Sequence, residues 1–260
     1  MSVREDVAFL VGSDSRVEIL RELVEEDRRP TDLASDVSCA RETIHRTLSG
    51  FVEREWVEQE GREYGATPVG QLVMEQYEAL ESTVEDAREF GPFLLNVGNV
   101  ASEIPREALR EATVTTATAE NPHAPLDRYV SWLGTRTVSR FRGMSPIVSP
   151  IFNEAAERVV GPETELELVV DESVLDVSER EYPDAFERAL SLDRVTLFLS
   201  PDAVEFGFAI VDGDVAVSAC DGGGNVVAVV DGTNDALYEW ATGVYERRRA
   251  DADTVTSTSL

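Results

Sequence analysis

Residues 30–70 constrain the fold of this 260-residue chain more than any other segment. They contain two short helical patterns, two extended runs around a glycine, and a new helix start at Thr67 and Pro68. The second helical pattern begins at Arg41. Its apolar residues recur at the i, i+4, i+7 and i+8 positions that share one helix face, namely Ile44, Leu48, Phe51 and Val52. The sequence therefore predicts a short helix that buries one face and leaves the other in solvent.

The solvent side of that helix carries side chains that suit contact with nucleic acid. Arg, Thr, His and Ser can hydrogen-bond to base edges, and a short helix of this kind fits the major groove of DNA. The two extended runs, residues 56–59 and 63–66, predict a hairpin that turns at residues 60–62. The expected DNA-binding residues are Arg41, Glu42, Thr43, His45, Arg46, Ser49 and, on the hairpin, Arg62.

Residues 33–70 resemble the winged helix-turn-helix of archaeal transcription regulators, and the hairpin is then the wing. The resemblance is carried by Leu33-Ala34, Val37, the run from Arg41 to Arg46, Leu48, Tyr64 and the run from Thr67 to Gly70. The sequence departs from the pattern at Ala40, where such domains place a Ser or Thr that caps the recognition helix. Alanine there gives up about 1 kcal/mol of capping. The alternative to DNA binding is a winged helix that serves as a scaffold and binds another protein.

The charge of the chain indicates the solvent in which it works. The net charge is −28, all 23 basic residues are Arg, and there is no Lys. An acid excess without lysine is typical of a protein kept soluble in concentrated salt, so we interpret the chain as haloarchaeal in type. Residues 1–80 hold 9 Arg against 18 Asp plus Glu. This balance does not exclude DNA, because counterion release contributes little to affinity in molar salt.

The two cysteines, Cys39 and Cys220, indicate neither a metal site nor a disulfide. They lie far apart, and no CxxC or Cys/His spacing for zinc occurs. We expect Cys39 to pack at the turn between the two short helices. The first ten residues contain no long apolar run, so we expect no signal peptide, no membrane span, a cytoplasmic location and reduced thiols.

The helix that starts at Pro68 carries an apolar seam beyond the compact winged domain. Spacings of four and three separate Val73, Tyr77, Leu80, Val84 and Ala87. We expect the seam to pair with the same helix of a second copy and to form a homodimer; the alternative is packing on the chain's own C-terminal half. The predicted division is a winged helix-turn-helix in residues 1–72, a helical linker and dimerisation region in 73–118, an α/β domain in 119–250 and a disordered tail in 251–260.

Residues 114–249 alternate between strand and helix patterns and end in a run of hairpin strands. The predicted strands are 114–118, 138–144, 166–170, 195–199, 206–211, 215–220 and 226–230, with helices near 126–133, 150–160, 182–190 and 236–249. This order predicts an α/β domain with a mixed sheet. The whole chain is thus expected to combine an α+β winged domain with an α/β domain.

Three segments of this half, residues 145–175, 206–224 and 238–249, resemble the C-terminal sensor domain of the archaeal methanogenesis-regulatory-protein type. With the winged helix, the resemblance covers about 240 residues of the sequence. More distantly, the domain resembles the sensor halves of sugar-responsive archaeal regulators, which share a sheet with phospholipase D-like enzymes. The resemblance implies a transcription regulator with a C-terminal sensing domain, whose effector, if it has one, would be a small molecule.

Catalysis of the phospholipase D type is not expected. Such an enzyme needs a nucleophilic His and a Lys one residue apart, whereas this chain has no Lys and only His45 and His123. Phosphate-cradling and serine-nucleophile motifs are also absent, so we expect neither an enzyme nor a cofactor.

A small molecule would be expected beyond the carboxyl ends of the strands. The candidate ligand-binding residues are Arg140, Arg142, Ser145 and Ser149, in and after the strand at 138–144. The alternative for the two arginines is pairing with local acids.

Overall fold

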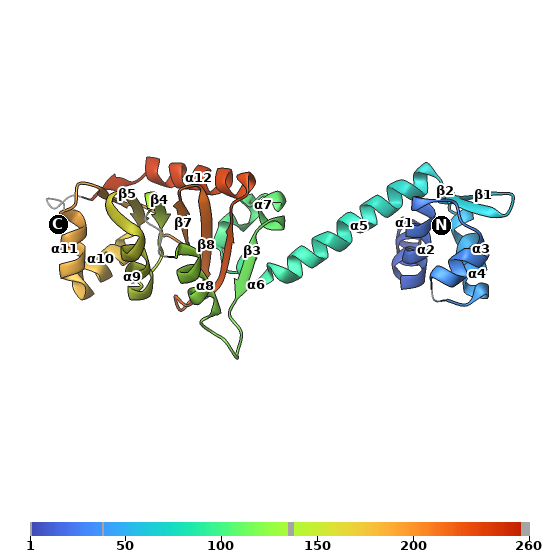
Figure 1. The fold of residues 1–260 in the computed structure, drawn as a ribbon, viewed down its shortest axis with the longest axis horizontal. Helices are drawn as coiled ribbons and strands as arrows, with labels where there is room; N and C mark the ends of the chain where they lie inside the picture. Colours follow the sequence, from blue (N-terminus) through green and yellow to red (C-terminus); the bar gives the residue numbers. More distant parts are fainter. Residues whose placement is uncertain (1, 38, 135–137, 256–260) are drawn as a thin grey trace. The chain divides into compact units, whose positions relative to one another are not determined.

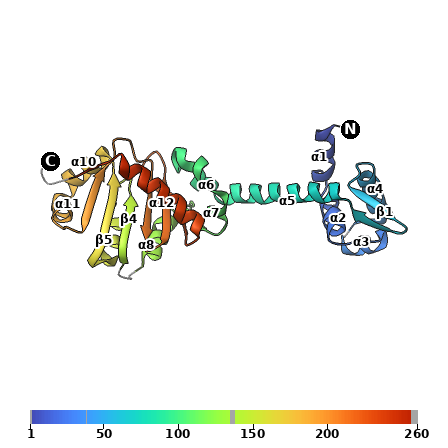
Figure 2. The ribbon, with the colours of Figure 1, turned by 90° about the horizontal axis from the view of Figure 1, so that it is seen from above.

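The computed structural model describes residues 2–37, 39–134 and 138–255, which divide into two compact units, Met1–Glu85 and Asp86–Leu260 (Figures 1 and 2). The division falls inside a single helix, α5 (Pro68–Glu89). The predicted boundaries after residues 72 and 118 separate expected roles and stay predictions.

The first unit is built from helices and one hairpin, which confirms the predicted winged helix-turn-helix. Its elements are α1 (Val3–Val11), α2 (Asp14–Glu25), α3 (Pro30–Asp36), α4 (Arg41–Val52), β1 (Val57–Glu60), β2 (Glu63–Ala66) and the first turns of α5. One cluster of buried residues joins all the helices and β1, with Leu20, Leu33 and Ile44 fully enclosed. Cys39 packs against this cluster, as predicted.

The apolar face of α4 differs from the predicted face at one position. Ile44, Leu48 and Phe51 are buried, but Val52 is 42% exposed. Each helical residue is rotated about 100° from the one before it, so Val52, eight residues after Ile44, points roughly 80° away from it. Val52 is also the last residue of the helix, and both facts leave it in solvent. Thr47, 2% exposed, completes the buried face instead.

The second unit contains an eight-stranded mixed sheet, which confirms the predicted α/β domain. The strands are β3 (Thr113–Thr116), β4 (Val138–Met144), β5 (Val160–Val170), β6 (Val195–Leu199), β7 (Phe206–Val211), β8 (Asp214–Cys220), β9 (Val226–Gly232) and β10 (Asp253–Thr254). Their order across the sheet is β10-β6-β5-β4-β7-β8-β9-β3. The pairs β4–β5 and β5–β6 are parallel, and all other pairs are antiparallel.

Helices cover both faces of this sheet (Figures 1 and 2). On one face α12 (Asp235–Ala250) crosses the strands and packs, with α6 (Gly91–Leu94), η1 (Gly98–Glu103) and α7 (Arg106–Arg110), in the largest core cluster. The other face carries α8 (Ala124–Leu133), α9 (Pro150–Val159), α10 (Glu172–Glu181) and α11 (Pro183–Leu190). Burial on both faces explains why β7 is apolar throughout instead of alternating.

Two parts of the second unit differ from the sequence prediction. Helix α10 was not predicted, because its ten residues are mostly polar and only Val174 and Leu175 are buried. The predicted disordered tail is wrong for residues 253–255: Asp253 and Thr254 pair with β6, and Val255 is 8% exposed. The partner strand supplies hydrogen bonds that composition does not reveal, while residues 256–260 lie outside the described residues.

Asp171 connects three segments at the carboxyl end of β5. Its carboxylate caps α10 by accepting from the Val174 N–H at 3.0 Å, and it accepts from the Ser173 hydroxyl at 2.6 Å. It also accepts from the N–H of Val204, ahead of β7, at 2.9 Å. Burial by itself would raise the pKa of Asp171, but these hydrogen bonds to the charged form outweigh it and lower the pKa.

We predict that Asp171→Ala lowers the free energy of unfolding by about 2–3 kcal/mol, because a helix cap is lost and a buried N–H is left without a partner. The matched control is Asp176→Ala, on the exposed side of the same helix, with an effect below about 0.5 kcal/mol. Since the folded pKa of Asp171 is lowered, its contribution should be complete above the ordinary pKa of 3.8 and disappear as the pH falls through the folded value. Denaturant unfolding followed by tryptophan fluorescence measures both; equal losses in the two variants would contradict the assignment.

Candidate functional site

The side of α4 that faces away from the core carries the predicted DNA-binding residues. Arg41, Glu42, His45, Arg46 and Ser49 are exposed, and Thr43 is half-buried. The helix begins at Arg41 with Ala40 at the cap and no side-chain cap, as its sequence predicts. Ser49 donates its hydroxyl to the carbonyl of His45 at 2.9 Å, so this side chain is held along the helix.

Close packing behind α4 fixes which side of the helix is exposed. A Cβ at Gly50 would overlap the ring of Phe9, so α1 approaches α4 more closely there than a larger residue allows. The Arg54 guanidinium lies 3.9 Å from the centroid of the Phe9 ring and pairs with Asp6 at 2.9 Å. These contacts hold the helix from the end opposite Arg41.

The wing is a tight antiparallel hairpin in which Val57 pairs with Ala66 and Glu60 with Glu63. Gly61 lies at φ +64, a conformation that favours glycine in the turn, and the exposed Arg62 follows it. The base of the wing is held by a bridge between Arg28 and Tyr64. The Thr67 hydroxyl donates to the carbonyl of Glu55 at 2.6 Å and accepts from the Gly70 N–H at 3.2 Å, which ties the wing to the start of α5.

Ion pairs distinguish the three arginines predicted for DNA from four other arginines of the first unit. Arg21, Arg28, Arg29 and Arg54 all pair with carboxylates, and Arg28 alone contacts Glu22, Glu26 and Asp36. By contrast, Arg41, Arg46 and Arg62 form no ion pair with any described residue. The three arginines predicted for DNA are therefore available to an external partner, although the wing also carries exposed acids such as Glu58 and Glu60.

The structure does not bring the four predicted ligand-binding residues together. Arg140 and Arg142 lie on the face of the sheet that α12 covers. On that face Arg140 lies 3.8 Å from Glu167 of the neighbouring strand β5. Arg142, 8% exposed, lies 3.6 Å from Glu246 and donates to the Tyr238 hydroxyl at 3.2 Å. Both arginines thus adopt the alternative of pairing with local acids.

The two serines lie near the other face of the sheet. Ser145 donates to the carbonyl of Ile147 at 2.8 Å, and Ser149 caps α9. The strand alternation that separates Arg140 and Arg142 from Phe141 explains the split, since Phe141 points to the face that bears α9.

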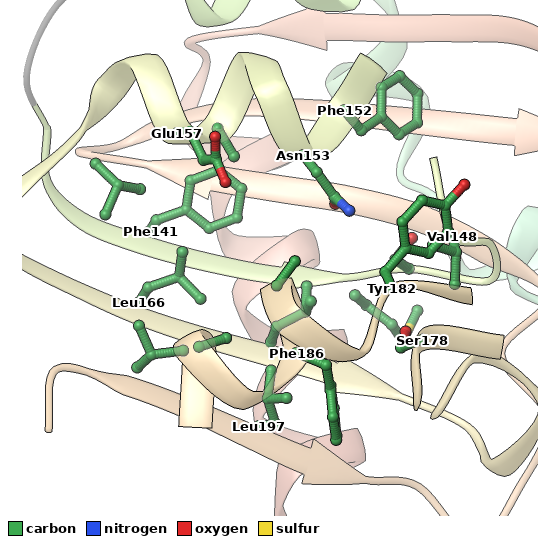
Figure 3. Close-up of a pocket in the computed structure, with 18 of the residues that line it drawn as sticks. Phe141, Val148, Phe152, Asn153, Glu157, Leu166, Ser178, Tyr182, Phe186 and Leu197 are labelled. Atoms are coloured by element: carbon green, nitrogen blue, oxygen red, sulfur yellow. The ribbon is translucent and has the colours of Figure 1, made fainter. Parts of the chain in front are cut away.

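A cavity of about 370 Å³ lies on that second face, between α9 and α11 (Figure 3). Figure 3 shows Phe152 and Asn153 projecting from α9, with Phe186 and Leu197 on the opposite side. Its walls are mainly apolar, and Ser145 is the predicted ligand residue that lines it. The sequence signals for this cavity are the spacing of Phe152 and Ala156 in α9 and the alternation of Leu166 and Leu168 in β5. The same patterns are typical of a packed core, so they do not indicate a cavity by themselves.

No cluster of metal-binding side chains is found among the described residues. His45 lies in α4 and His123 precedes α8, and no three His, Cys, Asp or Glu side chains cluster to hold a metal ion in residues 2–37, 39–134 and 138–255. In the same part of the chain, no helix combines the length and the apolar character needed to span a bilayer.

Comparisons with known proteins identify both units. Residues 122–251 match the family described as the middle domain of the methanogenesis regulatory protein FilR1, and residues 4–89 match the family described as the HVO_A0261 N-terminal domain. No curated protein matches the sequence.

Three solved structures are similar at low sequence identity. TrmBL2, an archaeal chromatin protein, is 13% identical over 93% of this chain and 99% of its own, with a TM-score of 0.40. Nuc of Salmonella typhimurium, a phospholipase D family member, is 16% identical over 56% of this chain and 100% of its own, at 0.42. NucT of Helicobacter pylori is 9% identical over 56% and 99%, at 0.45. At these TM-scores we draw no functional conclusion from the three structures. The family matches are sufficient: the chain belongs to the family of the FilR1 middle domain, joined here to an HVO_A0261-type N-terminal domain.

Proposed function

We propose that this protein is a sequence-specific DNA-binding transcription regulator of the cytoplasm, with α4 in the major groove and the wing on the backbone. The supporting observation is that the exposed Arg41, Arg46 and Arg62 have no ion pair among the described residues, while four other arginines of the same unit are neutralised by acids. Glu42, Thr43, His45 and Ser49 lie beside Arg41 and Arg46 on α4 and complete the proposed interface.

The regulator-type domains also favour a protein that is not an enzyme, with the second unit as the sensing half for an effector. The remaining candidate is a winged helix that binds a protein partner through the same face. Exposed acids on the wing favour this alternative, and the following experiment distinguishes the two.

We predict that Arg46→Ala weakens binding to the specific operator by about 1–3 kcal/mol, because a bidentate contact to a guanine would be lost. Arg62→Ala should weaken binding to all sequences about equally, since a wing contact to phosphate carries no sequence information. The matched control is Arg21→Ala, whose guanidinium pairs with Glu78 and Glu81 on α5 and should leave affinity unchanged.

Genome-wide immunoprecipitation of the tagged protein would supply the operator, and fluorescence anisotropy in molar potassium chloride would measure the affinity. Unchanged operator binding in Arg46→Ala would contradict the groove assignment. Recovery of protein without DNA enrichment would favour the scaffold.

The charge of the protein generates a second prediction, that DNA binding and folding both strengthen from low to molar potassium chloride. With a net charge of −28, the protein repels DNA and its own surface when the Debye length is about 30 Å, at 0.01 M salt, and much less when it is about 3 Å, at 1 M. Salt titrations of operator affinity and of the unfolding midpoint measure the two slopes. An affinity that falls steadily over the whole range would show that ordinary counterion release dominates.

The predicted seam of α5 is divided between two environments. Val73 and Tyr77 pack against the core of the first unit, which the sequence analysis did not expect. Leu80 and Val84 are 56% and 43% exposed. We propose that these two exposed residues pair with the same residues of a second copy, because a two-fold axis through α5 would place two α4 helices on successive major grooves about 34 Å apart. Two apolar residues are too few to hold a dimer alone, so the second unit should add contacts.

We predict a dimer in molar salt that Leu80→Glu/Val84→Glu converts to monomer, since charges would replace the apolar contact. Val7→Glu, at an exposed apolar position on α1 of the first unit, is the control and should remain dimeric. Sedimentation or light scattering measures the mass. A monomeric wild type would refute the dimer, and a dimer that survives the double substitution would place the interface elsewhere.

A further inference from the structure

The cavity between α9 and α11 is open space beside the parallel strands β4, β5 and β6. Leu166 and Leu168 in β5 line it and remain half-buried, although β5 lies between two other strands. Val169, on the opposite face of the same strand, is fully buried under α12. An unfilled apolar surface on a central strand is unfavourable, so a ligand that covers it would gain the free energy of apolar burial.

The walls of the cavity suit a hydrocarbon or an aromatic ring better than a polar ligand. Aliphatic side chains of β5 and β6, among them Leu168 and Leu197, form its floor. Aromatic side chains line it from several elements: Tyr129, Phe141, Phe152, Tyr182 and Phe186. The pKa of Tyr129 is raised by burial, so its hydroxyl stays protonated. A sugar would leave most of its hydroxyl groups without partners against these walls.

The charged side chains and the hydroxyl groups of the cavity lie at opposite ends, because of the direction in which the chain runs. In each β-α-β crossover the helix runs back along the strands, so the end of α11 and the start of β6 lie at the amino ends of the parallel strands. Arg188 and Arg194 line the cavity there, together with Glu157 at the end of α9. Figure 3 shows Glu157 beside Phe141 and Leu166, at the end away from Tyr182 and Val148. Ser145, Ser178 and Tyr182 line the other end.

The exposed Arg188 and the half-buried Arg194 have no ion-pair partner in the part of the chain that the structure describes. The Nε of Arg194 is buried without a hydrogen bond. Most arginines of the second unit behave differently: Arg128, for example, binds Asp231 through two hydrogen bonds. Glu157 is the acidic residue among those that line the cavity, so it can balance the charge of one guanidinium group and leaves the other positive charge unbalanced. A buried donor without a partner is costly, and a carboxylate is the group that a guanidinium binds best.

We propose that this cavity binds an amphipathic monocarboxylate, with its apolar body along β5 and its carboxylate at Arg188 and Arg194. The regulatory meaning of the ligand rests on the proposed function, but the binding site does not, because it is formed entirely within the second unit. Arg140 and Arg142, on the opposite face of the sheet, have no part in it.

The test uses the full chain in molar potassium chloride, without DNA, and titrates octanoate and octanol by calorimetry. Octanoate should saturate one site per chain and bind more tightly than octanol. Arg194→Gln should weaken octanoate about tenfold and leave octanol unchanged, because one charge-assisted contact is lost. The control is Arg180→Gln, whose guanidinium pairs with Glu181 outside the cavity and which should bind both probes normally.

A second variant, Ala189→Phe, fills the cavity from α11 and should abolish binding of both probes, while thermal unfolding shows that the protein is folded. No saturable binding of octanoate, equal effects of Arg194→Gln on both probes, or tight binding of maltose that octanoate cannot displace would each overturn the proposal. DNA binding measured on the same samples is independent, so failure of either proposal can be recognised separately.

Discussion

Burial of one face of α4 is the interaction on which the proposed function of the first unit depends. Ile44, Leu48 and Phe51 enter a core shared by every helix of the unit, and Gly50 allows α1 to approach closely from behind. With that face fixed, Arg41 and Arg46 can point only outward. Apolar burial thus determines which polar side chains are exposed to a binding partner, even in the absence of that partner.

In the second unit apolar burial is incomplete, because a cavity remains between α9 and α11. Helix α12 covers one face of the sheet closely, and α8 and α9 cover part of the other, but α9 and α11 do not meet over β5. Asp171 holds the start of α10 to the loop before β7, so the crossover that ends in α11 is attached firmly at one end. The result is a sheet with a space on one side, in which the proposed ligand would lie.

Charge has a different role in each unit. The chain carries 51 acidic residues, and pairing with them neutralises most of its arginines. Among the described arginines that form no ion pair, Arg41, Arg46 and Arg62 lie on the proposed DNA interface, and Arg188 and Arg194 lie at one end of the cavity.

The sequence by itself determined the element types and the two-part organisation of this protein. The period of Ile44, Leu48 and Phe51 and the glycine turn at Gly61 are local signals, so α4 and the wing could be predicted, as could most of the strands. Tertiary structure decided what those signals could not. Helix α10 buries only Val174 and Leu175, and Asp171 joins its start to the distant loop before β7. Asp253 and Thr254 form a strand because β6 offers a partner. Val73 and Tyr77 joined the winged core instead of a seam. Arg142 pairs with Glu246 instead of a ligand, and Leu166 lines a cavity instead of a filled core. Both outcomes depend on which helix covers each face of the sheet. That choice is made by packing between segments far apart in the sequence, so the local pattern does not reveal it.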